Sequence, residues 1–251
     1  MYHYALVRQP GENFAEGLTT LDLGKPDYEK ALQQHKLYCE ALKSCGLELL
    51  VLPPDLLHPD GCFVEDTAII TERVVITTRP GNQTRRGEEE TIARLLHQYR
   101  GNMTKVTAPA TVDGGDVLRV GDHFYIGISH RTNGEGALQL SAILLKYGYT
   151  SSTIPVKTVL HLKTGVTRID RERLISVQEL SDHFRQFEVI EVDESERYAA
   201  NCLLVNDFLL MTGGFPRAKQ AISRIRGNIK EVEMSEFEKM EGGLTCLSLL
   251  F

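Results

Sequence analysis

The stretch Asp113-Gly-Gly-Asp-Val-Leu-Arg-Val-Gly-Asp-His-Phe-Tyr-Ile-Gly-Ile128 contains two strand-like runs on either side of a Gly-Asp turn. A tight polar turn between two apolar runs is typical of a β-hairpin. The following segment, Glu135–Tyr147, repeats apolar residues at helical spacing. The expected buried face of this helix consists of Leu138, Leu140, Ile143 and Leu144. The stretch therefore predicts a strand–strand–helix unit.

Three further pairs of strand-like runs have the same form. These pairs are Thr67–Thr71 with Val74–Thr78, Gly165–Ile169 with Arg173–Val177, and Cys202–Val205 with Phe208–Met211. Helical patterns accompany them along the chain. The predicted helices span Glu88–Gln98, the segment from Pro216 through Ile225, and a leading segment that starts at Pro26 and Asp27 and ends at Gly46. The chain therefore repeats one supersecondary unit.

A residue with a chemically active side chain stands before the first strand of each unit. These residues are Glu65 with Asp66, Asp113, His161, Asn201 and Cys246. Successive units begin 40 to 48 residues apart, a period typical of repeat architectures. The unit that starts at Cys246 lacks a second strand, which the N-terminal run Tyr4–Val7 can supply. We therefore predict an α/β fold in which residues 1–251 form a single domain, a ring closed by the N-terminal strand, with these residues at one end of its axis.

The bulk composition is that of an ordinary globular protein, with 42% hydrophobic and 25% charged residues. The net charge of −6 argues against nucleic acid as a partner, because nucleic-acid binding uses clustered Lys and Arg. No apolar run approaches the roughly 18 residues that span a bilayer, and the N-terminus lacks the apolar segment of a signal peptide. We expect a cytoplasmic protein that binds neither nucleic acid nor membrane. The oligomeric state stays open, a homodimer included.

The five cysteines, at positions 39, 45, 62, 202 and 246, have no C-x-x-C motif and no zinc-ligand spacing. This pattern predicts reduced thiols and not a disulfide framework. A free cysteine in an apolar run is usually a small core residue, and we keep this interpretation for Cys39, Cys45, Cys62 and Cys202. Cys246 differs because its phase in the repeat gives it chemically active partners.

The residues at the end of the ring together suit covalent catalysis on a cationic carbon. A thiolate of Cys246 is the expected nucleophile, once a cation or a base has lowered the pKa of the thiol. His161 is expected to protonate a leaving amine and then to take a proton from water. One carboxylate beside the imidazole would fix its orientation, and further carboxylates would pair with a planar guanidinium.

Each of these residues also has a purely structural interpretation. A single histidine after a strand is commonly a hydrogen-bonded strand-end residue, and Asp113-Gly-Gly-Asp116 is typical of a turn. The acidic pair Glu65-Asp66 is typical of a solvent-exposed strand start. Arg85 and Arg131 could be surface side chains.

Several short motifs occur in a fixed order along nearly the whole chain. They are Gly17-Leu-Thr19, Phe63-Val-Glu-Asp66, Thr78-Arg-Pro-Gly81, Arg85-Arg86, Gly114-Gly-Asp116, Arg131-Thr-Asn133, His161-Leu-Lys-Thr-Gly165, Ala200-Asn-Cys202 and the tail with Cys246. In order and spacing these motifs resemble the dimethylarginine dimethylaminohydrolases, a family with the pentein fold. The resemblance implies a five-bladed α/β propeller of ββαβ repeats, in agreement with the predicted ring.

The resemblance also implies a reaction, the hydrolysis of Nω-methylated L-arginine to L-citrulline and dimethylamine or methylamine. The reaction would pass through a covalent S-alkylthiouronium intermediate and would need no cofactor or metal. Cys246 would be the nucleophile, His161 the general acid and base, and Asp113 the third member of the triad. For substrate binding, the implied contacts are Asp66 to the guanidinium, Glu65 and Asp60 in support of the pocket, Arg85 and Arg131 to the α-carboxylate, Leu18 on a lid formed by Gly17–Lys25, and the carbonyl of Met240.

Three other interpretations stay open at this point. An arginine deiminase would release ammonia from unmethylated arginine, but such enzymes usually carry an added helical domain for which this chain has no room. A non-catalytic pentein binding module would be expected to have lost the thiol, the imidazole or the carboxylates, and all are present. A Cys/His pair can also capture zinc, which we expect to inhibit the protein and not to serve as its cofactor.

Overall fold

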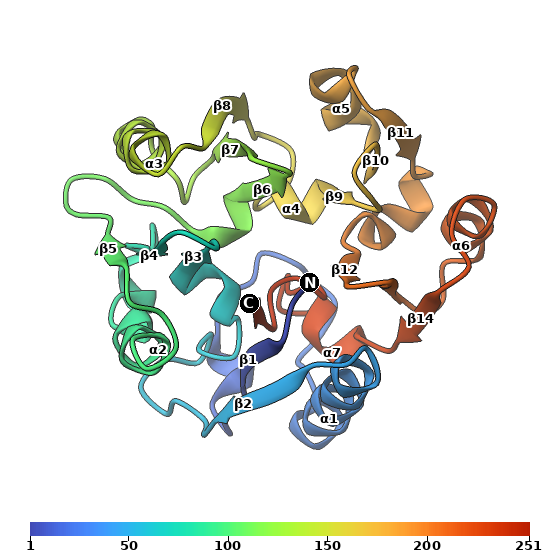
Figure 1. The fold of residues 1–251 in the computed structure, drawn as a ribbon. Coiled ribbons are helices and arrows are strands. Elements are labelled where there is room, and N and C mark those ends of the chain that lie inside the picture. The colour runs from blue at the N-terminus through green and yellow to red at the C-terminus, as the bar shows by residue number, and fades with distance from the viewer.

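Five three-stranded sheets surround a central axis in the computed structural model, which describes residues 1–251 (Figure 1). The sheets consist of β3 (Ala68–Ile70), β4 (Val75–Thr77) and β5 (Met103–Lys105); β6 (Val117–Val120), β7 (His123–Ile128) and β8 (Thr150–Pro155); β9 (Val166–Arg168), β10 (Arg173–Ser176) and β11 (Glu188–Glu191); β12 (Leu203–Val205), β13 (Phe208–Thr212) and β14 (Ile229–Val232); and β15 (Leu249–Leu250), β1 (Tyr4–Arg8) and β2 (Glu48–Leu52). In every sheet the middle strand runs antiparallel to the first strand and parallel to the third. The predicted five-bladed arrangement of ββαβ repeats is confirmed.

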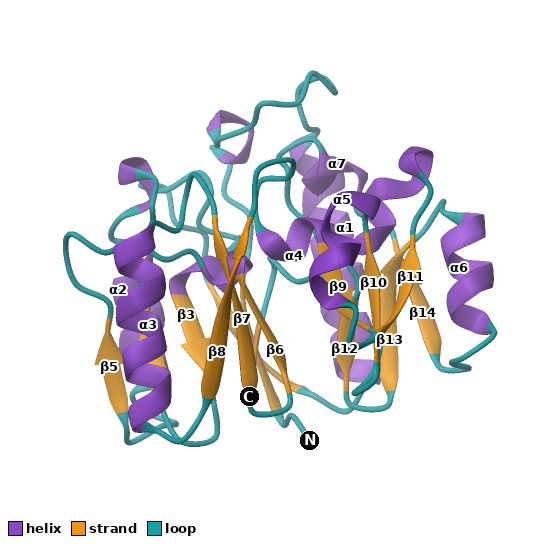
Figure 2. Ribbon diagram, turned by 90° about the horizontal axis from the view of Figure 1, so that it is seen from above, coloured by secondary structure: helices purple, strands orange, loops and turns teal.

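Helices cross from the second to the third strand on the outside of the blades (Figures 1 and 2). These crossover helices are α1 (Tyr28–Ser44), α2 (Glu88–Leu96), α3 (Gly134–Lys146), α5 (Gln178–Ser181) and α6 (Pro216–Ser223). The single-turn helices α4 (Leu162–Gly165) and α7 (Ser235–Glu238) lie between blades in the sequence. Short 3-10 turns occupy Phe14–Glu16, Val64–Thr67, Gln83–Arg85, Gly114–Asp116, Asp182–Phe184 and Glu194–Ala200.

The ends of the helices follow from local side-chain chemistry. Asp27 caps α1 by accepting a hydrogen bond from the backbone N–H of Lys30 at 3.0 Å, and Gly46 takes the positive φ of 88° that follows the helix. On α3, Leu140 and Leu144 are buried, as expected. Leu138 is 74% exposed, so its predicted place on the buried face is wrong. It lies on the solvent side because the face of α3 that packs against the blade is narrower than the spacing of the leucines suggested.

The two ends of the chain meet in one sheet. β1 pairs with β15 in antiparallel register, with Ala5 opposite Leu250 and Leu6 opposite Leu249. The backbone N–H groups of His3 and Tyr4 both donate to the carbonyl oxygen of Phe251, at 2.8 and 2.7 Å. Figure 1 shows both termini beside the axis. The last blade is therefore assembled from both ends of the chain, and its core strand β1 is buried along most of its length.

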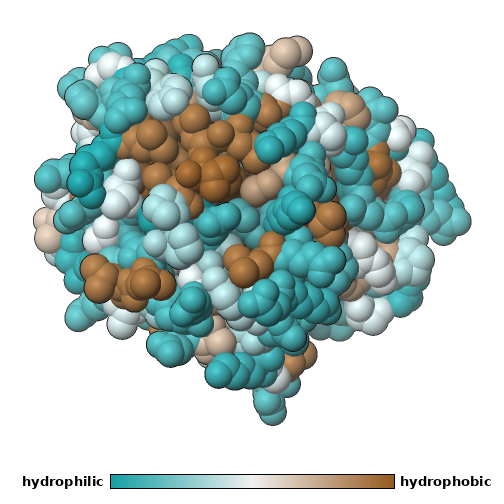
Figure 3. Space-filling model, turned by 90° about the horizontal axis from the view of Figure 1, so that it is seen from below, coloured by the Kyte–Doolittle hydropathy of each residue, from teal (hydrophilic) through white to brown (hydrophobic).

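The outer strand of this last blade differs from the outer strands of the other four. β2 has the sequence Glu-Leu-Leu-Val-Leu, and Val51 is 51% exposed. The exposed positions of β5, β8, β11 and β14 carry Lys, Ser, Thr, Glu or Pro instead. Figure 3 shows an apolar patch on the lower side of the view in Figure 1, where α1, β2 and α2 lie.

Short turns precede the first strand of each blade near the axis, and the residues with chemically active side chains lie on these turns. Asp66 lies within its 3-10 turn, Asp113 and His161 cap theirs, and Asn201 follows the fourth. Cys246 lies in a turn just before β15. The repeat therefore brings residues from five distant segments to one end of the ring. None of the helices combines the length and apolar character needed to cross a membrane.

Candidate active site

A small pocket at this end of the axis has a volume of about 20 Å³. It is lined by Leu18, Asp60, Phe63, Asp66, Arg85, Arg131, Leu160, His161, Met240, Glu241, Gly242 and Cys246. The structure thus gathers all of the predicted site residues here except Asp113 and Glu65, which lie behind the pocket wall.

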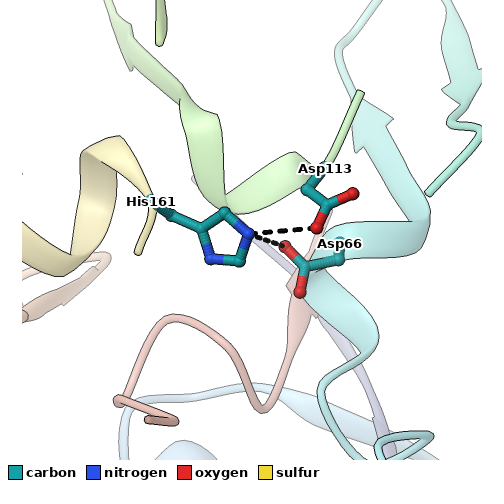
Figure 4. Close-up of side chains that lie close together, drawn as sticks. All are labelled: Asp66, Asp113 and His161. Carbon is teal, nitrogen blue, oxygen red and sulfur yellow. Dashed lines mark hydrogen bonds and ion pairs between the residues drawn. The ribbon is translucent and has the colours of Figure 1, made fainter. Parts of the chain in front are cut away.

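His161 and Asp113 are paired at the pocket wall (Figure 4). The Nε2 atom of His161 lies 3.0 Å from Oδ2 of Asp113 and 4.0 Å from Oδ1 of Asp66. Asp113 is completely buried, and its Oδ1 atom accepts a hydrogen bond from the backbone N–H of Gly81 at 2.8 Å. Asp113 therefore holds the imidazole from the side away from the pocket, which is the place of the third member of a triad.

The charge state of His161 follows from these neighbours. Burial by itself lowers the pKa of the imidazole, but Asp66, Asp113 and Asp116 together outweigh it and raise the pKa of His161 to about 9. Asp116 was not among the predicted site residues. It accepts a hydrogen bond from the backbone N–H of Leu162 at 2.9 Å and one from Ser129 at 2.6 Å, so it also anchors the turn that carries His161. At neutral pH the imidazole is protonated in the ligand-free protein.

Asp66 is held by groups of the protein itself. Its carboxylate accepts hydrogen bonds from Nη1 of Arg85 at 2.5 Å and from the backbone N–H of Gly115 at 2.8 Å. Burial raises the pKa of Asp66, but the positive charges of His161 and Arg85 outweigh burial and lower it below its usual range. Asp66 is therefore an anion that a cationic group in the pocket would meet.

Arg85, which the resemblance paired with a substrate carboxylate, already makes several hydrogen bonds to groups of the protein. Its Nε and Nη2 atoms both bond the carboxylate of Glu88, at 3.0 and 2.7 Å, and Nη2 also donates to the carbonyl of Phe63. The whole guanidinium is buried. Glu88 was not predicted as part of this site, although its position three residues after Arg85 at the start of α2 was a usable signal.

Arg131 has an unused donor. Its Nη1 atom lies 3.7 Å from Oδ2 of Asp113 and is buried without a hydrogen-bond partner. A buried guanidinium nitrogen without a partner is unfavourable in the free protein and is relieved by an anionic ligand. Of the two arginines, Arg131 is the one with a guanidinium donor that no hydrogen bond occupies.

Cys246 is half-buried beside these groups, with its Sγ atom accepting a hydrogen bond from the backbone N–H of Gly243 at 3.3 Å. Burial, followed by the negative charges of Glu65 and Asp66, raises the pKa of the thiol to about 12. The thiol is therefore protonated in the ligand-free protein at neutral pH. A cation bound against Asp66 would reverse part of this shift, because it favours the thiolate.

Glu65 lies beneath the pocket and not in it. Its carboxylate accepts hydrogen bonds from Nζ of Lys163 at 2.5 Å and from Oγ1 of Thr245 at 2.8 Å. Glu65, Lys163 and Thr245 line a second cavity of about 160 Å³ that is formed by residues of all five blades. Lys163 and Thr245 were not predicted as site residues, although each is a near neighbour in sequence of His161 or Cys246.

Of the segment Gly17–Lys25, which the resemblance implied as a lid, Leu18 lines the pocket. The backbone N–H of Leu18 donates to both oxygens of Asp60, at 3.1 and 3.2 Å. Farther along, the backbone N–H and the hydroxyl of Thr20 donate to the carboxylate of Glu241, at 2.7 and 3.1 Å. Glu241 adopts a positive φ of 58° and was not predicted as a lid contact. This segment is thus fastened by two carboxylates, Asp60 at Leu18 and Glu241 at Thr20.

Asp66, Asp113 and His161 also present three ligand atoms within 4.8 Å of one another, a grouping that could hold a metal ion. The sequence contains no metal-ligand spacing motif that includes these residues, because they come from three different blades. In this structure Asp66 and Asp113 already bond Arg85 and His161. The grouping therefore serves an internal ion-pair network.

The remaining four cysteines lie outside the pocket and are free thiols, with Cys45, Cys62 and Cys202 buried and Cys39 half-buried. Their packing in the hydrophobic cores agrees with the structural interpretation given to them from the sequence.

Known proteins with similar sequences support the same family. The arginine deiminase family model matches residues 56–207. The N(G),N(G)-dimethylarginine dimethylaminohydrolase of Pseudomonas aeruginosa is 44% identical over the full length of both chains. The protein of the same name from Streptomyces coelicolor is 38% identical over 98% of this chain and 95% of its own.

Solved structures lead to the same result. A cysteine-to-serine variant of the Pseudomonas aeruginosa enzyme in complex with citrulline has a TM-score of 0.98 at 44% identity, with both chains covered completely. A histidine-to-glycine variant of dimethylarginine dimethylaminohydrolase, an adduct with S-methyl-L-thiocitrulline, matches with the same score, identity and coverage. The N-terminal domain of ArgZ, at 18% identity and a TM-score of 0.88, shares the fold. This chain therefore belongs to the dimethylarginine dimethylaminohydrolase family, as its motifs predicted.

Proposed function

We propose that residues 1–251 act as one catalytic domain that hydrolyses Nω-methylated L-arginine to L-citrulline and a methylamine, with Cys246 as the nucleophile. The hydrolysis itself accords with the activity named for the full-length relatives. The observation that carries the assignment of residues is the convergence of Cys246, the His161–Asp113 pair and Asp66 on one pocket.

The pocket is suited to a zwitterionic amino acid with a cationic end. The guanidinium lies against Asp66, with Asp60 and Glu65 supporting the negative side of the pocket. The α-carboxylate binds Arg131, whose Nη1 atom has no hydrogen-bond partner in the free protein. Arg85 adds positive charge and holds Asp66 in place. Leu18 and the carbonyl of Met240 close the pocket over the substrate.

The first half-reaction breaks the bond to the methylated nitrogen. Binding of the guanidinium cation lowers the pKa of the Cys246 thiol, which releases its proton to solvent. The thiolate attacks the central carbon and forms a tetrahedral adduct. Protonated His161 then donates its proton to the methylated nitrogen, the carbon–nitrogen bond breaks, and dimethylamine or methylamine leaves. The product of this step is an S-alkylthiouronium bound to Cys246.

The second half-reaction uses the same histidine as a base. Neutral His161 takes a proton from water, and the hydroxide attacks the thiouronium carbon. Collapse of this second tetrahedral adduct breaks the carbon–sulfur bond, regenerates the thiolate and releases L-citrulline, while the proton of the added hydroxyl passes to solvent. Asp113 stabilises the imidazolium in both half-reactions.

The test is a substrate panel with the wild-type protein and the variant Cys246→Ser. We expect citrulline and dimethylamine from asymmetric dimethylarginine with the wild type, and none above background with the variant. Unmethylated arginine in the same panel identifies a deiminase by its ammonia. Undiminished turnover by Cys246→Ser would disprove the nucleophile assignment.

A further inference from the structure

Asn201 stands before the first strand of the fourth repeat. The corresponding residues of the other repeats are Asp66, Asp113, His161 and Cys246, and Asn201 alone has no role in the proposed reaction. It follows the 3-10 turn Glu194–Ala200 and precedes β12, and it is almost completely buried. Its side chain does not line the pocket. A buried polar side chain at this place needs partners, and those partners show what it does.

The carboxamide of Asn201 joins the two segments that carry the reacting groups. Its Oδ1 atom accepts a hydrogen bond from the backbone N–H of Thr245 at 3.0 Å. Its Nδ2 atom donates to the carbonyl of Lys163 at 2.8 Å and to Oγ1 of Thr245 at 3.1 Å. Thr245 directly precedes Cys246 in the sequence, and Lys163 follows His161 by two residues. One planar group thus connects the nucleophile segment to the histidine segment.

These bonds are part of a closed circuit beneath the pocket. The hydroxyl of Thr245 donates to Oε2 of Glu65 at 2.8 Å, and Nζ of Lys163 bonds Oε1 of the same carboxylate. The circuit therefore passes from Asn201 through Thr245, Glu65 and Lys163 and returns to Asn201. All its members except Lys163 are buried, and Lys163 is half-buried.

Asn201 also packs tightly against the turn that holds the thiol. A Cβ atom added to Gly243 would lie 2.5 Å from both Cγ and Oδ1 of Asn201. The backbone N–H of Gly243 donates to Sγ of Cys246. The Cys246 turn is therefore set against Asn201 by two hydrogen bonds and by direct contact.

We propose that Asn201 is a positioning residue that sets the placement of the Cys246 thiol relative to the His161 imidazole. This inference rests on the proposed roles of Cys246 and His161. In both half-reactions the His161 imidazole transfers a proton to or from a group at the carbon that the Cys246 sulfur attacks or is bonded to. The placement of the sulfur relative to the imidazole therefore determines the rate. Small displacements of reacting groups cost large factors in rate without changing how the substrate binds.

The chemistry of the amide explains why asparagine suits this place. Only a carboxamide offers an acceptor to the Thr245 N–H and two donors to the Lys163 carbonyl and the Thr245 hydroxyl from one short side chain. Aspartate has the same shape but would direct an acceptor at the Lys163 carbonyl and add a negative charge near Glu65. Alanine would leave the Thr245 N–H and the Lys163 carbonyl without a partner.

The experiment compares the variants Asn201→Ala, Asn201→Asp, Thr245→Val and Thr245→Ser in steady-state hydrolysis of asymmetric dimethylarginine. We expect Asn201→Ala, Asn201→Asp and Thr245→Val to lower kcat by about 10- to 100-fold with KM within about threefold of wild type. Thr245→Ser keeps the hydroxyl and should keep most of kcat. Asn201→Ala combined with Thr245→Val should lose less than the product of the two single losses, because both changes remove the bond from Nδ2 of Asn201 to the Thr245 hydroxyl.

Two controls separate positioning from general destabilisation. Asn228→Ala alters an exposed asparagine away from the pocket and should leave kcat unchanged. Thermal unfolding of each variant shows whether it is folded at the assay temperature. If Asn201→Ala is unfolded, Asn201→Asp replaces it in the test. The inference is overturned if folded Asn201 variants retain full kcat, if the loss falls on KM, or if the double variant loses the product of the two single losses.

The same series distinguishes this inference from the proposed function. If Cys246→Ser still turns over substrate, the assignment of the nucleophile fails whatever Asn201 does. If Cys246→Ser is inactive and Asn201→Ala is fully active, the nucleophile stands and only the positioning role fails.

Discussion

Arg85 and Arg131 illustrate how differently two arginines at one pocket can behave. Arg85 is buried and bonds two carboxylates, Asp66 and Glu88, so most of its donors are occupied before any ligand arrives. Arg131 has a buried Nη1 atom that makes no hydrogen bond, although it lies 3.7 Å from Oδ2 of Asp113. The family resemblance implied the same contact for both, to the α-carboxylate of the substrate, because a sequence motif does not show which guanidinium donors the protein already occupies. The distinction depends on contacts that only the fold creates.

The two arginines should therefore respond differently to substitution. Arg131→Ala should raise KM for asymmetric dimethylarginine about 10- to 100-fold while the protein stays folded, because a charge-assisted contact to the ligand is lost. Arg85→Met should lower the free energy of unfolding by about 3 to 5 kcal/mol, because it leaves two buried carboxylates without their cation. Urea unfolding and steady-state kinetics on both variants check this. Equal stability of the two variants would contradict the distinction.

At the scale of the elements, the pairing of β1 with β15 links the nucleophile to the start of the chain. Cys246 lies three residues before Leu249, whose side chain is buried in the core shared by the first and last blades. The short β15 is the end strand of its sheet and pairs there with β1. The geometry of the thiol therefore depends on a strand from the opposite end of the chain.

Substitution at Leu249 tests this dependence, with Leu138 as the matched control. Leu249→Ala should lower the free energy of unfolding by about 2 to 5 kcal/mol, because it removes a buried side chain from a hydrophobic core. Leu138→Ala, at an exposed position, should change it by about 0.5 kcal/mol or less. Urea unfolding of both variants measures the difference. A similar small effect at both positions would show that β15 does not hold the last blade.

At the scale of the whole molecule, the sequence predicted the arrangement better than it predicted the contacts. Strand pairs and crossover helices followed from apolar periodicity and polar turns, and the common phase of Asp66, Asp113, His161 and Cys246 predicted their convergence. The bond between Lys163 and Glu65 joins residues 98 positions apart, and neither periodicity nor phase indicates which charged side chains face each other. Likewise, neither periodicity nor phase predicts that Thr20 of the segment Gly17–Lys25 bonds Glu241.

The stability of the whole molecule should depend on pH through His161. Its pKa is raised from 6.5 to about 9 in the folded protein, so folding favours the protonated form. The stabilisation is complete below pH 6.5 and is lost as the pH rises through 9, by a total of about 3 kcal/mol. Urea unfolding between pH 6 and 10 should show this loss in the wild type and a flatter profile in His161→Asn. Parallel profiles would contradict the charge state assigned to His161.

If the five blades bring Cys246 to the carbon of a bound methylarginine, the protein should carry a covalent adduct on Cys246 during turnover. The mass of the protein measures this adduct. Acid-quenched protein incubated with asymmetric dimethylarginine is analysed by intact-protein mass spectrometry and then by peptide mapping. We predict an added mass equal to substrate minus dimethylamine, located on Cys246 and absent from Cys246→Ser. Citrulline formation with no adduct, or an adduct on another residue, would contradict the account.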